Sequence, residues 1–116
     1  MLNWEAAPAV YLFTATIDMR CGFDRLADLV KSELGLSPLN GSLFIFLGRG
    51  RKRVKILFWE RDGYWLLYKR LEAGMFRVEV CNGYEQLTGV DLKLLLSGME
   101  LSRIKLRRDV EKGVYS

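Results

Sequence analysis

The stretch from Ser42 to Arg70 constrains the fold more than any other part of the chain. It contains three apolar runs, Leu43–Leu47, Val54–Trp59 and Tyr64–Tyr68, which two short polar segments separate. Runs of five or six residues that are rich in β-branched and aromatic side chains, and bounded by Gly and Asp, are typical of strands. Asp62-Gly63 favours a tight hairpin, because glycine adopts a positive φ at little steric cost. The stretch therefore predicts a three-stranded antiparallel meander.

The period of two along these strands divides their side chains between the two faces of the sheet. One face is apolar enough to form a core. The other mixes lysine, tryptophan and leucine, so a helix must cover it or it must be presented to a partner. The polar and aromatic members that we assign to this mixed face are Lys55, Trp59, Trp65 and Lys69.

The flanking segments predict further strands and helices. Val10–Thr16 and Met75–Val80 have the composition and alternation of strands. Apolar residues recur at helical spacing from Phe23 to Leu34, and Gly35 provides a C-terminal stop. Thr88, followed three residues later by Asp91, predicts the capping box of a second helix. We therefore expect an α+β fold, in which an antiparallel meander of about four to five strands carries one or two helices on one face.

Length and composition are those of one globular domain. The 116 residues are half hydrophobic, which is enough for a single core and too apolar for disorder. We expect one domain over 1–116, with a loose lead-in at 1–9 and a basic, mobile tail at 102–116. The chain has two isolated cysteines, no signal-peptide pattern and no apolar run of about 20 residues, so we expect a cytoplasmic protein without a membrane segment.

The formal net charge of +4 is small, but the positive residues are clustered. Clustering creates a local positive potential, for which nucleic acid is the commonest partner. We predict DNA binding through the basic turn after the first apolar run, supported by the end of the third run and by the tail. The predicted DNA-binding residues are Arg49, Arg51, Lys52, Arg53, Lys55, Lys69, Arg70, Arg103, Lys105, Arg107 and Arg108. The alternative is a solvated loop whose charge prevents edge-to-edge aggregation.

Catalytic and metal-binding patterns are missing from the sequence. There is no histidine, which is the commonest general base and zinc ligand, and no phosphate-loop or nucleophile motif. Carboxylates could in principle hold Mg²⁺ for phosphoryl transfer, but helix and turn positions explain most of them. The carboxylates concerned are Asp18, Asp24, Asp28, Glu60 and Asp62. We expect no catalytic residue, no metal and no cofactor.

Asp18 and Arg20 form a motif to which no strand or helix assigns a role. We favour a helix N-cap combined with a local ion pair, and the alternative is a contact that serves function. The sequence leaves the role of these two residues open.

The order of several short motifs resembles one protein family. These motifs, in chain order, are Asp18-Met19-Arg20, Gly22-Phe23-Asp24, Leu43–Phe46, Arg53–Leu57, Asp62-Gly63 and Tyr68–Phe76. Their combination, over about Val10 to Arg108, resembles the small accessory proteins, TnpB or Orf2-like, of bacterial insertion sequences of the IS66 type. The chain departs from the family pattern at Ile17 and Cys21, where Thr and Lys are common.

This resemblance implies a non-catalytic accessory protein for transposition of an insertion sequence. Such proteins are encoded beside a larger transposase that carries the acidic catalytic site, and no catalytic residues can be transferred from them. The expected partners are DNA and the large transposase, and exposed strand edges make a homodimer plausible. Two alternatives stay open: a protein-interaction module that binds the transposase through the mixed face without contacting DNA, and, less favoured, a small metal-dependent nuclease that uses Asp18 and other acidic residues.

Overall fold

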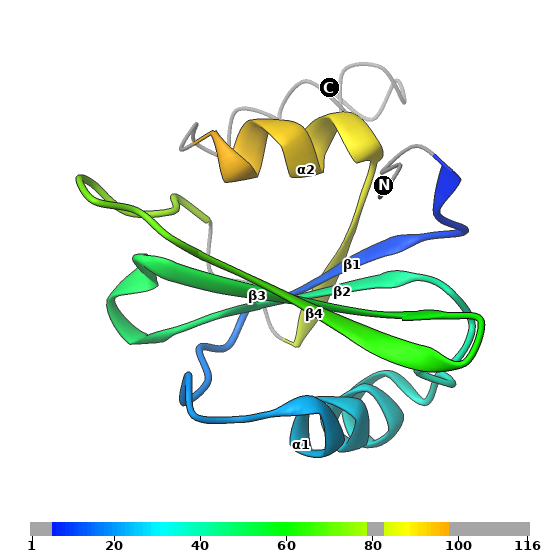
Figure 1. Cartoon of the computed structure of the whole chain (residues 1–116). Helices are drawn as coiled ribbons and strands as arrows, with labels where there is room; N and C mark the ends of the chain where they lie inside the picture. Colours follow the sequence, from blue (N-terminus) through cyan, green and yellow to red (C-terminus); the bar gives the residue numbers. More distant parts are fainter. Residues whose placement is uncertain (1–5, 79–82, 98–116) are drawn as a thin grey trace.

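A twisted five-stranded sheet lies between two helices, which cover opposite faces (Figure 1). The computed structural model describes residues 6–78 and 83–97, and the strand order is β4-β3-β2-β1-β5. The strands are β1 (Val10–Phe13), β2 (Leu43–Leu47), β3 (Arg53–Glu60), β4 (Gly63–Arg70) and β5 (Tyr84–Leu87). The helices are α1 (Phe23–Leu29), which continues into the π-helical turn η2 (Val30–Leu34), and α2 (Gly89–Leu96).

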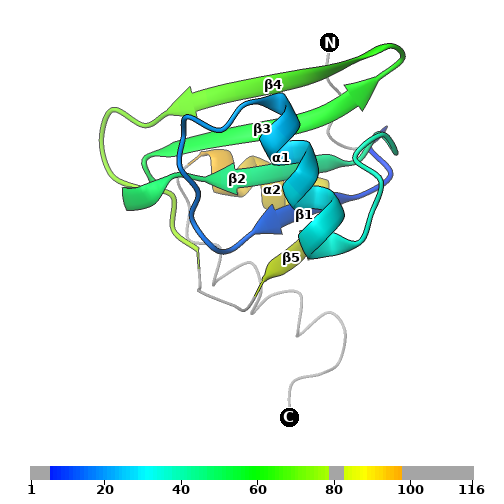
Figure 2. The same ribbon diagram turned by 90° about the horizontal axis from the view of Figure 1, so that it is seen from below.

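The predicted meander is confirmed. β2 pairs antiparallel with β3, and β3 pairs antiparallel with β4 along their whole length, from Arg53 opposite Arg70 to Glu60 opposite Gly63. β1 pairs parallel with β2 and antiparallel with β5. The parallel pair needs a crossover, since two adjacent parallel strands cannot be joined by a tight turn. α1 provides this crossover, and Figure 2 shows it lying across the sheet.

Each face of the sheet has its own core. The core under α2, which we call the upper core, gathers alternate residues of the central strands, such as Ile45 and Ile56, with Leu92 and Leu95 of the helix. The core under α1, the lower core, gathers the residues between them, such as Phe44 and Leu57, with Leu26 of the helix. All five residues of β2 are buried, because side chains on both of its faces are covered.

The stop and capping residues in the sequence correctly predicted where the first helical segment ends and where the second helix starts. The helical segment ends at Gly35, whose φ of 65° is the left-handed conformation that favours glycine at a C-cap. The N-cap of α2 is Thr88, whose hydroxyl accepts the Asp91 N–H at 3.0 Å while the Asp91 carboxylate accepts the Thr88 N–H at 3.0 Å. This is the predicted capping box.

Three expectations about the fold need correction. The two helices lie on opposite faces rather than on one, because the central strands are apolar on both faces. Met75–Val80 was predicted as a strand, but residues 75–78 form a loop that buries Phe76 and Val78 in the upper core, while 79–80 lie outside the described residues. The hairpin turn is made by Arg61 and Asp62, and Gly63 is already paired with Glu60 in the strands.

Candidate nucleic-acid interface

The turn between β2 and β3, Gly48–Arg53, forms the most basic part of the described surface, and we call it the basic turn. Its first half is the short 3₁₀ turn Arg49–Arg51, closed by hydrogen bonds of 3.0 Å from the Gly48 N–H to the Arg53 carbonyl and from the Arg51 N–H to the Gly48 carbonyl. Gly50 and Arg51 both have positive φ, at 80° and 56°. This conformation leaves Arg49, Lys52 and Arg53 exposed to solvent.

Arg51 differs from its neighbours because it stabilises the turn. Its Nη1 donates to the Val78 carbonyl at 3.0 Å, and its own carbonyl accepts the Phe76 N–H at 2.6 Å. A further bond of 2.7 Å joins the Leu71 N–H to the Lys52 carbonyl. The loop after β4 therefore supports the basic turn, and Arg51 is half-buried between them.

Asp18 and Arg20 form an ion pair within a second turn, Asp18–Cys21, which we call the Asp18 turn. The Arg20 Nη2 lies 2.6 Å from Asp18 Oδ2, and the Arg20 Nε lies 3.0 and 3.1 Å from the two carboxylate oxygens. The Arg20 backbone N–H also donates to Asp18 Oδ1 at 2.9 Å. These side-chain and backbone hydrogen bonds, with a smaller contribution from the positive charge of Arg49, hold the pKa of Asp18 well below its usual range.

The predicted local ion pair is thus confirmed, but the predicted helix cap is wrong. The N-cap of α1 is Gly22, and no side chain caps it. Asp18 instead accepts the Arg20 backbone N–H and orients the Arg20 guanidinium, whose side chain is 91% exposed.

Three contacts fix the Asp18 turn beside the basic turn. The Ile17 N–H donates to the Leu47 carbonyl at 2.8 Å, in a parallel bridge between Ile17 and Gly48. The Met19 side chain packs so closely on Gly48 that a Cβ at this glycine would lie 2.7 Å from the Met19 Cγ. Lys55 provides the third contact, because its buried Nζ donates to the carbonyls of Met19 and Cys21, the latter at 2.8 Å.

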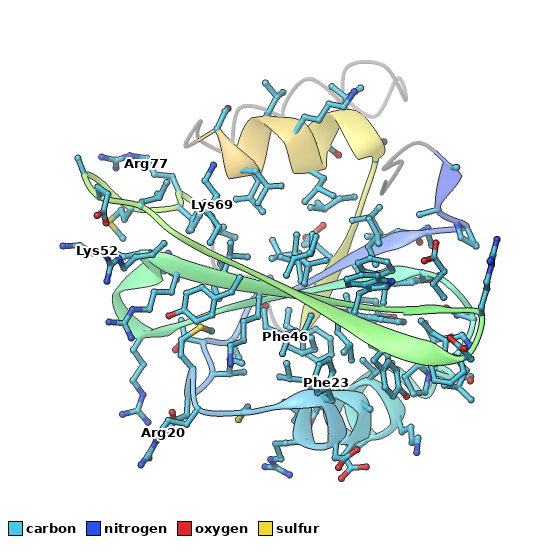
Figure 3. All side chains as sticks on the ribbon, in the orientation of Figure 1. Arg20, Phe23, Phe46, Lys52, Lys69 and Arg77 are labelled. Atoms are coloured by element: carbon cyan, nitrogen blue, oxygen red, sulfur yellow. The ribbon has the colours of Figure 1, made fainter. Side chains whose placement is uncertain are left out.

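The two turns enclose an open cleft of about 480 Å³. Four cationic side chains and one carboxylate line it, so that its formal charge is +3. The lining residues are Ile17, Asp18, Met19, Arg20, Arg49, Lys52 and Arg53. The structure thus brings three of the predicted DNA-binding residues together with the motif of unassigned role, at one end of the sheet. Figure 3 shows Arg20 and Lys52 at this end.

Within the described residues, the other predicted DNA-binding residues do not line this cleft. Lys55 is buried as described, and its Nζ also lies 5.6 Å from the Tyr68 ring centroid. Lys69 points to the opposite face of the sheet, where its Nζ donates to the Leu96 carbonyl at the end of α2, at 2.8 Å. Arg70 pairs with Glu72 at 3.0 Å. Arg103, Lys105, Arg107 and Arg108 lie outside the described residues.

Arg77 is an exposed cation that the sequence prediction left out. It was placed on a strand, but it lies in the loop that supports the basic turn, and Figure 3 shows it at the same end of the molecule as Lys52. The signal that could have identified it is the alternation of Phe76, Arg77 and Val78, which correctly separates buried from exposed positions.

The mixed face expected from the sequence does not exist as one surface. The register places Phe58 opposite Trp65 and Trp59 opposite Tyr64. Lys55 and Trp59 therefore lie on the α1 side, while Trp65 and Lys69 lie on the α2 side. Trp65 is 53% exposed, stacks on Phe58 and donates its Nε1–H to Glu60 at 3.1 Å.

Two further findings concern metals and membranes. Within residues 6–78 and 83–97, no three acidic, cysteine or histidine side chains come together as metal ligands. In the same part of the chain, no helix has the length and apolar character required to cross a bilayer.

Comparison with known proteins places these features in a family context. Residues 8–106 match the family described as "IS66 Orf2 like protein". A relative from Sinorhizobium fredii (strain NBRC 101917 / NGR234), named "Uncharacterized protein y4hO", is 38% identical over 92 residues, which cover 78% of this chain and 80% of the relative. "Uncharacterized protein y4jC" of the same strain is 30% identical over 104 residues, which cover 89% and 88%. No solved structure matches the chain significantly.

Proposed function

Because the chain belongs to the IS66 Orf2-like family and is a transposition-associated accessory protein, we propose that it binds DNA through the basic turn. A transposition factor acts where DNA ends are brought together, and a cluster of exposed cations supplies the contacts to phosphates that fix a protein on a duplex. We further propose that the bound protein helps to assemble the large transposase of the same element on that DNA.

One observation carries this proposal: the exposed cations Arg49, Lys52 and Arg53 converge with Arg20 on one cleft. A solvated loop that merely prevents aggregation would not need a second positively charged segment beside it. Here two segments far apart in the sequence are bonded together so that their positive side chains face the same space. Such convergence concentrates positive potential and favours an anionic ligand.

The test compares two double variants of equal charge. Lys52→Gln/Arg53→Gln removes two cations from the cleft, whereas Arg25→Gln/Lys31→Gln removes two exposed cations from the segment α1–η2. If Lys52 and Arg53 contact phosphates, the first variant should reduce the slope of log K against log salt by about 2, from about 0.9 per contact. The second variant should leave the slope within error of the unsubstituted protein. Fluorescence anisotropy with a labelled duplex from the element's end, measured over a salt series, gives both slopes.

Equal slopes for the two double variants would reject the basic turn as the DNA contact.

A second candidate function is favoured by the exposed Trp65 on β4, which lies at the edge of the sheet. In that case the protein would bind the transposase and not DNA. Absence of duplex binding at low salt, with co-purification of the transposase after nuclease treatment, would select this second candidate.

A further inference from the structure

The Asp18 turn forms the second wall of the cleft whose first wall is the basic turn. We infer that this cleft holds a phosphate group of the DNA backbone, with Arg20 donating from one wall and Lys52 and Arg53 from the other. The inference rests on the proposed DNA binding and deepens it, because it adds Asp18 and Arg20 to the contact surface and assigns each a role.

The wall that carries Arg20 is held rigidly against the sheet. Lys55, the third residue of β3, donates to two carbonyls of the loop that contains Arg20. Gly48 allows Met19 to approach at a distance that any other residue at position 48 would prevent. Binding residues are found disproportionately on loops that a rigid scaffold positions, and these two contacts position the Asp18 turn in this way.

Arg20 is oriented for an anionic ligand before one binds. The ion pair with Asp18 uses its Nε and Nη2, so that Nη1 remains to donate to a phosphate oxygen. A guanidinium held in one orientation loses little side-chain freedom when it binds, and its planar geometry suits phosphate. Its exposure of 91% means that a DNA strand can reach it.

The charges of the cleft also fit a phosphate. Asp18 would repel an anion if it stood alone, but its charge is already opposed by Arg20 at 2.6 Å. Arg49, Lys52 and Arg53 remain as positive charges on the other wall. Ile17 and Met19 add apolar side chains to the lining, against which the sugar that follows a phosphate can pack.

The role of Arg20 is tested by Arg20→Gln, with Arg25→Gln on α1 as the matched control. Both variants remove one exposed cation, but only the first removes a contact in the cleft. We expect Arg20→Gln to weaken binding of the labelled duplex about tenfold at 0.15 M salt, since one charge-assisted hydrogen bond is lost, and to reduce the salt slope by about 1. Arg25→Gln should change neither value beyond error. Arg20→Lys, which keeps the charge but not the planar fork, should restore the slope and only part of the affinity.

Asp18 is a positioning residue, and the sign of its effect tests that role. Asp18→Asn makes the protein more positive, so a purely electrostatic effect would strengthen binding. If Asp18 orients Arg20, the substitution should instead weaken binding about two- to tenfold, because a free side chain must be ordered. The weakening should disappear in the Arg20→Gln background, where there is no guanidinium to orient.

The outcomes separate this inference from the proposed function. If Lys52→Gln/Arg53→Gln weakens binding while Arg20→Gln behaves like Arg25→Gln, the inference is overturned and DNA binding through the basic turn stands. If Asp18→Asn strengthens binding in both backgrounds, the positioning role is overturned. If the unsubstituted protein binds no duplex at low salt, the proposed function itself is rejected.

Discussion

Lys55 shows how a single residue can belong to a basic cluster and yet have a structural role. It lies two residues after Arg53 in the chain, but its position within β3 places its side chain on the buried α1 side of the sheet and not at the turn. Its ammonium group is satisfied by the carbonyls of Met19 and Cys21 and by the nearby face of Tyr68. A buried charge is tolerated only when such partners are present. Lys55 therefore links the sheet to the Asp18 turn.

Substitution of Lys55 should destabilise the fold more than a change of charge alone would. Lys55→Met keeps the length of the side chain but leaves the two carbonyls without their donor, so we expect the free energy of unfolding to fall by about 1–3 kcal/mol. Lys31→Met, at an exposed position in η2, removes the same charge and should change stability by less than about 0.5 kcal/mol. Urea denaturation followed by circular dichroism measures both. Equal stability of the two variants would contradict the structural role.

The sequence could not have separated Lys55 from its neighbours. The clustering of positive residues in the sequence identified Arg49, Lys52 and Arg53, which do line the cleft. It also included Lys55, which is buried, because the charge of a lysine and its place in the sequence do not show whether its side chain is solvated. Arg20 was recognised as a motif residue, but its place beside the basic turn depends on the bridge between Ile17 and Gly48. Contacts between segments so distant in the chain leave no local pattern.

At the scale of elements, the β3–β4 hairpin has an unexpected turn. The sequence predicted the hairpin from Asp62-Gly63, and the hairpin is present, but the positive φ belongs to Arg61, at 57°. The Asp62 N–H donates to the Glu60 carbonyl at 2.7 Å across Arg61, which is the hydrogen bond of a γ-turn. A side chain at positive φ brings Cβ too close to the carbonyl oxygen, and this costs about 1–2 kcal/mol.

Arg61→Gly should therefore stabilise the protein. Relief of the strain exceeds the extra freedom that glycine gives to the unfolded chain, so we expect a gain of about 0.5–1 kcal/mol. Asp62→Gly is the matched control, because Asp62 does not have a positive φ and glycine there should destabilise by about 0.5–1 kcal/mol. Thermal unfolding of the two variants gives opposite shifts in Tm if the assignment is correct. A loss of stability in Arg61→Gly would contradict it.

Other elements were predictable where the signal was local. The capping box at Thr88, the stop at Gly35 and the apolar runs of β2, β3 and β4 were read correctly because each depends on neighbouring residues. The loop after β4 was mistaken for a strand because Phe76 and Val78 are buried alternately, as they would be in a sheet. The backbone of this loop instead forms hydrogen bonds with the basic turn, and alternate burial in the sequence does not reveal where a backbone forms its hydrogen bonds.

At the scale of the whole molecule, one sheet serves two cores. β2 contributes Leu43, Ile45 and Leu47 to the upper core and Phe44 and Phe46 to the lower core. Loss of packing in either core would therefore expose one face of the strand that both cores share. The sequence predicted the helices on one face of the sheet, and this was wrong. The parallel pairing of β1 with β2 and the antiparallel pairing of β5 with β1 depend on contacts between distant segments, which the sequence pattern does not show.

The shared strand predicts that the two layers unfold together. Leu95→Ala in the upper core and Leu26→Ala in the lower core each remove a fully buried side chain, so each should lower the free energy of unfolding by about 2–5 kcal/mol. Leu39→Ala, at a half-exposed loop position, should change it by less than about 0.5 kcal/mol.

Amide hydrogen exchange distinguishes shared from separate unfolding, because it reports the opening of each segment. If the layers are coupled, Leu95→Ala should lower protection in α1 as much as in α2, although α1 lies on the other face of the sheet. A loss of protection confined to α2 would show that this layer opens alone. The cleft is built from the turn between β2 and β3 and from the loop that leads into α1, so coupling would make its geometry depend on the packing of both cores.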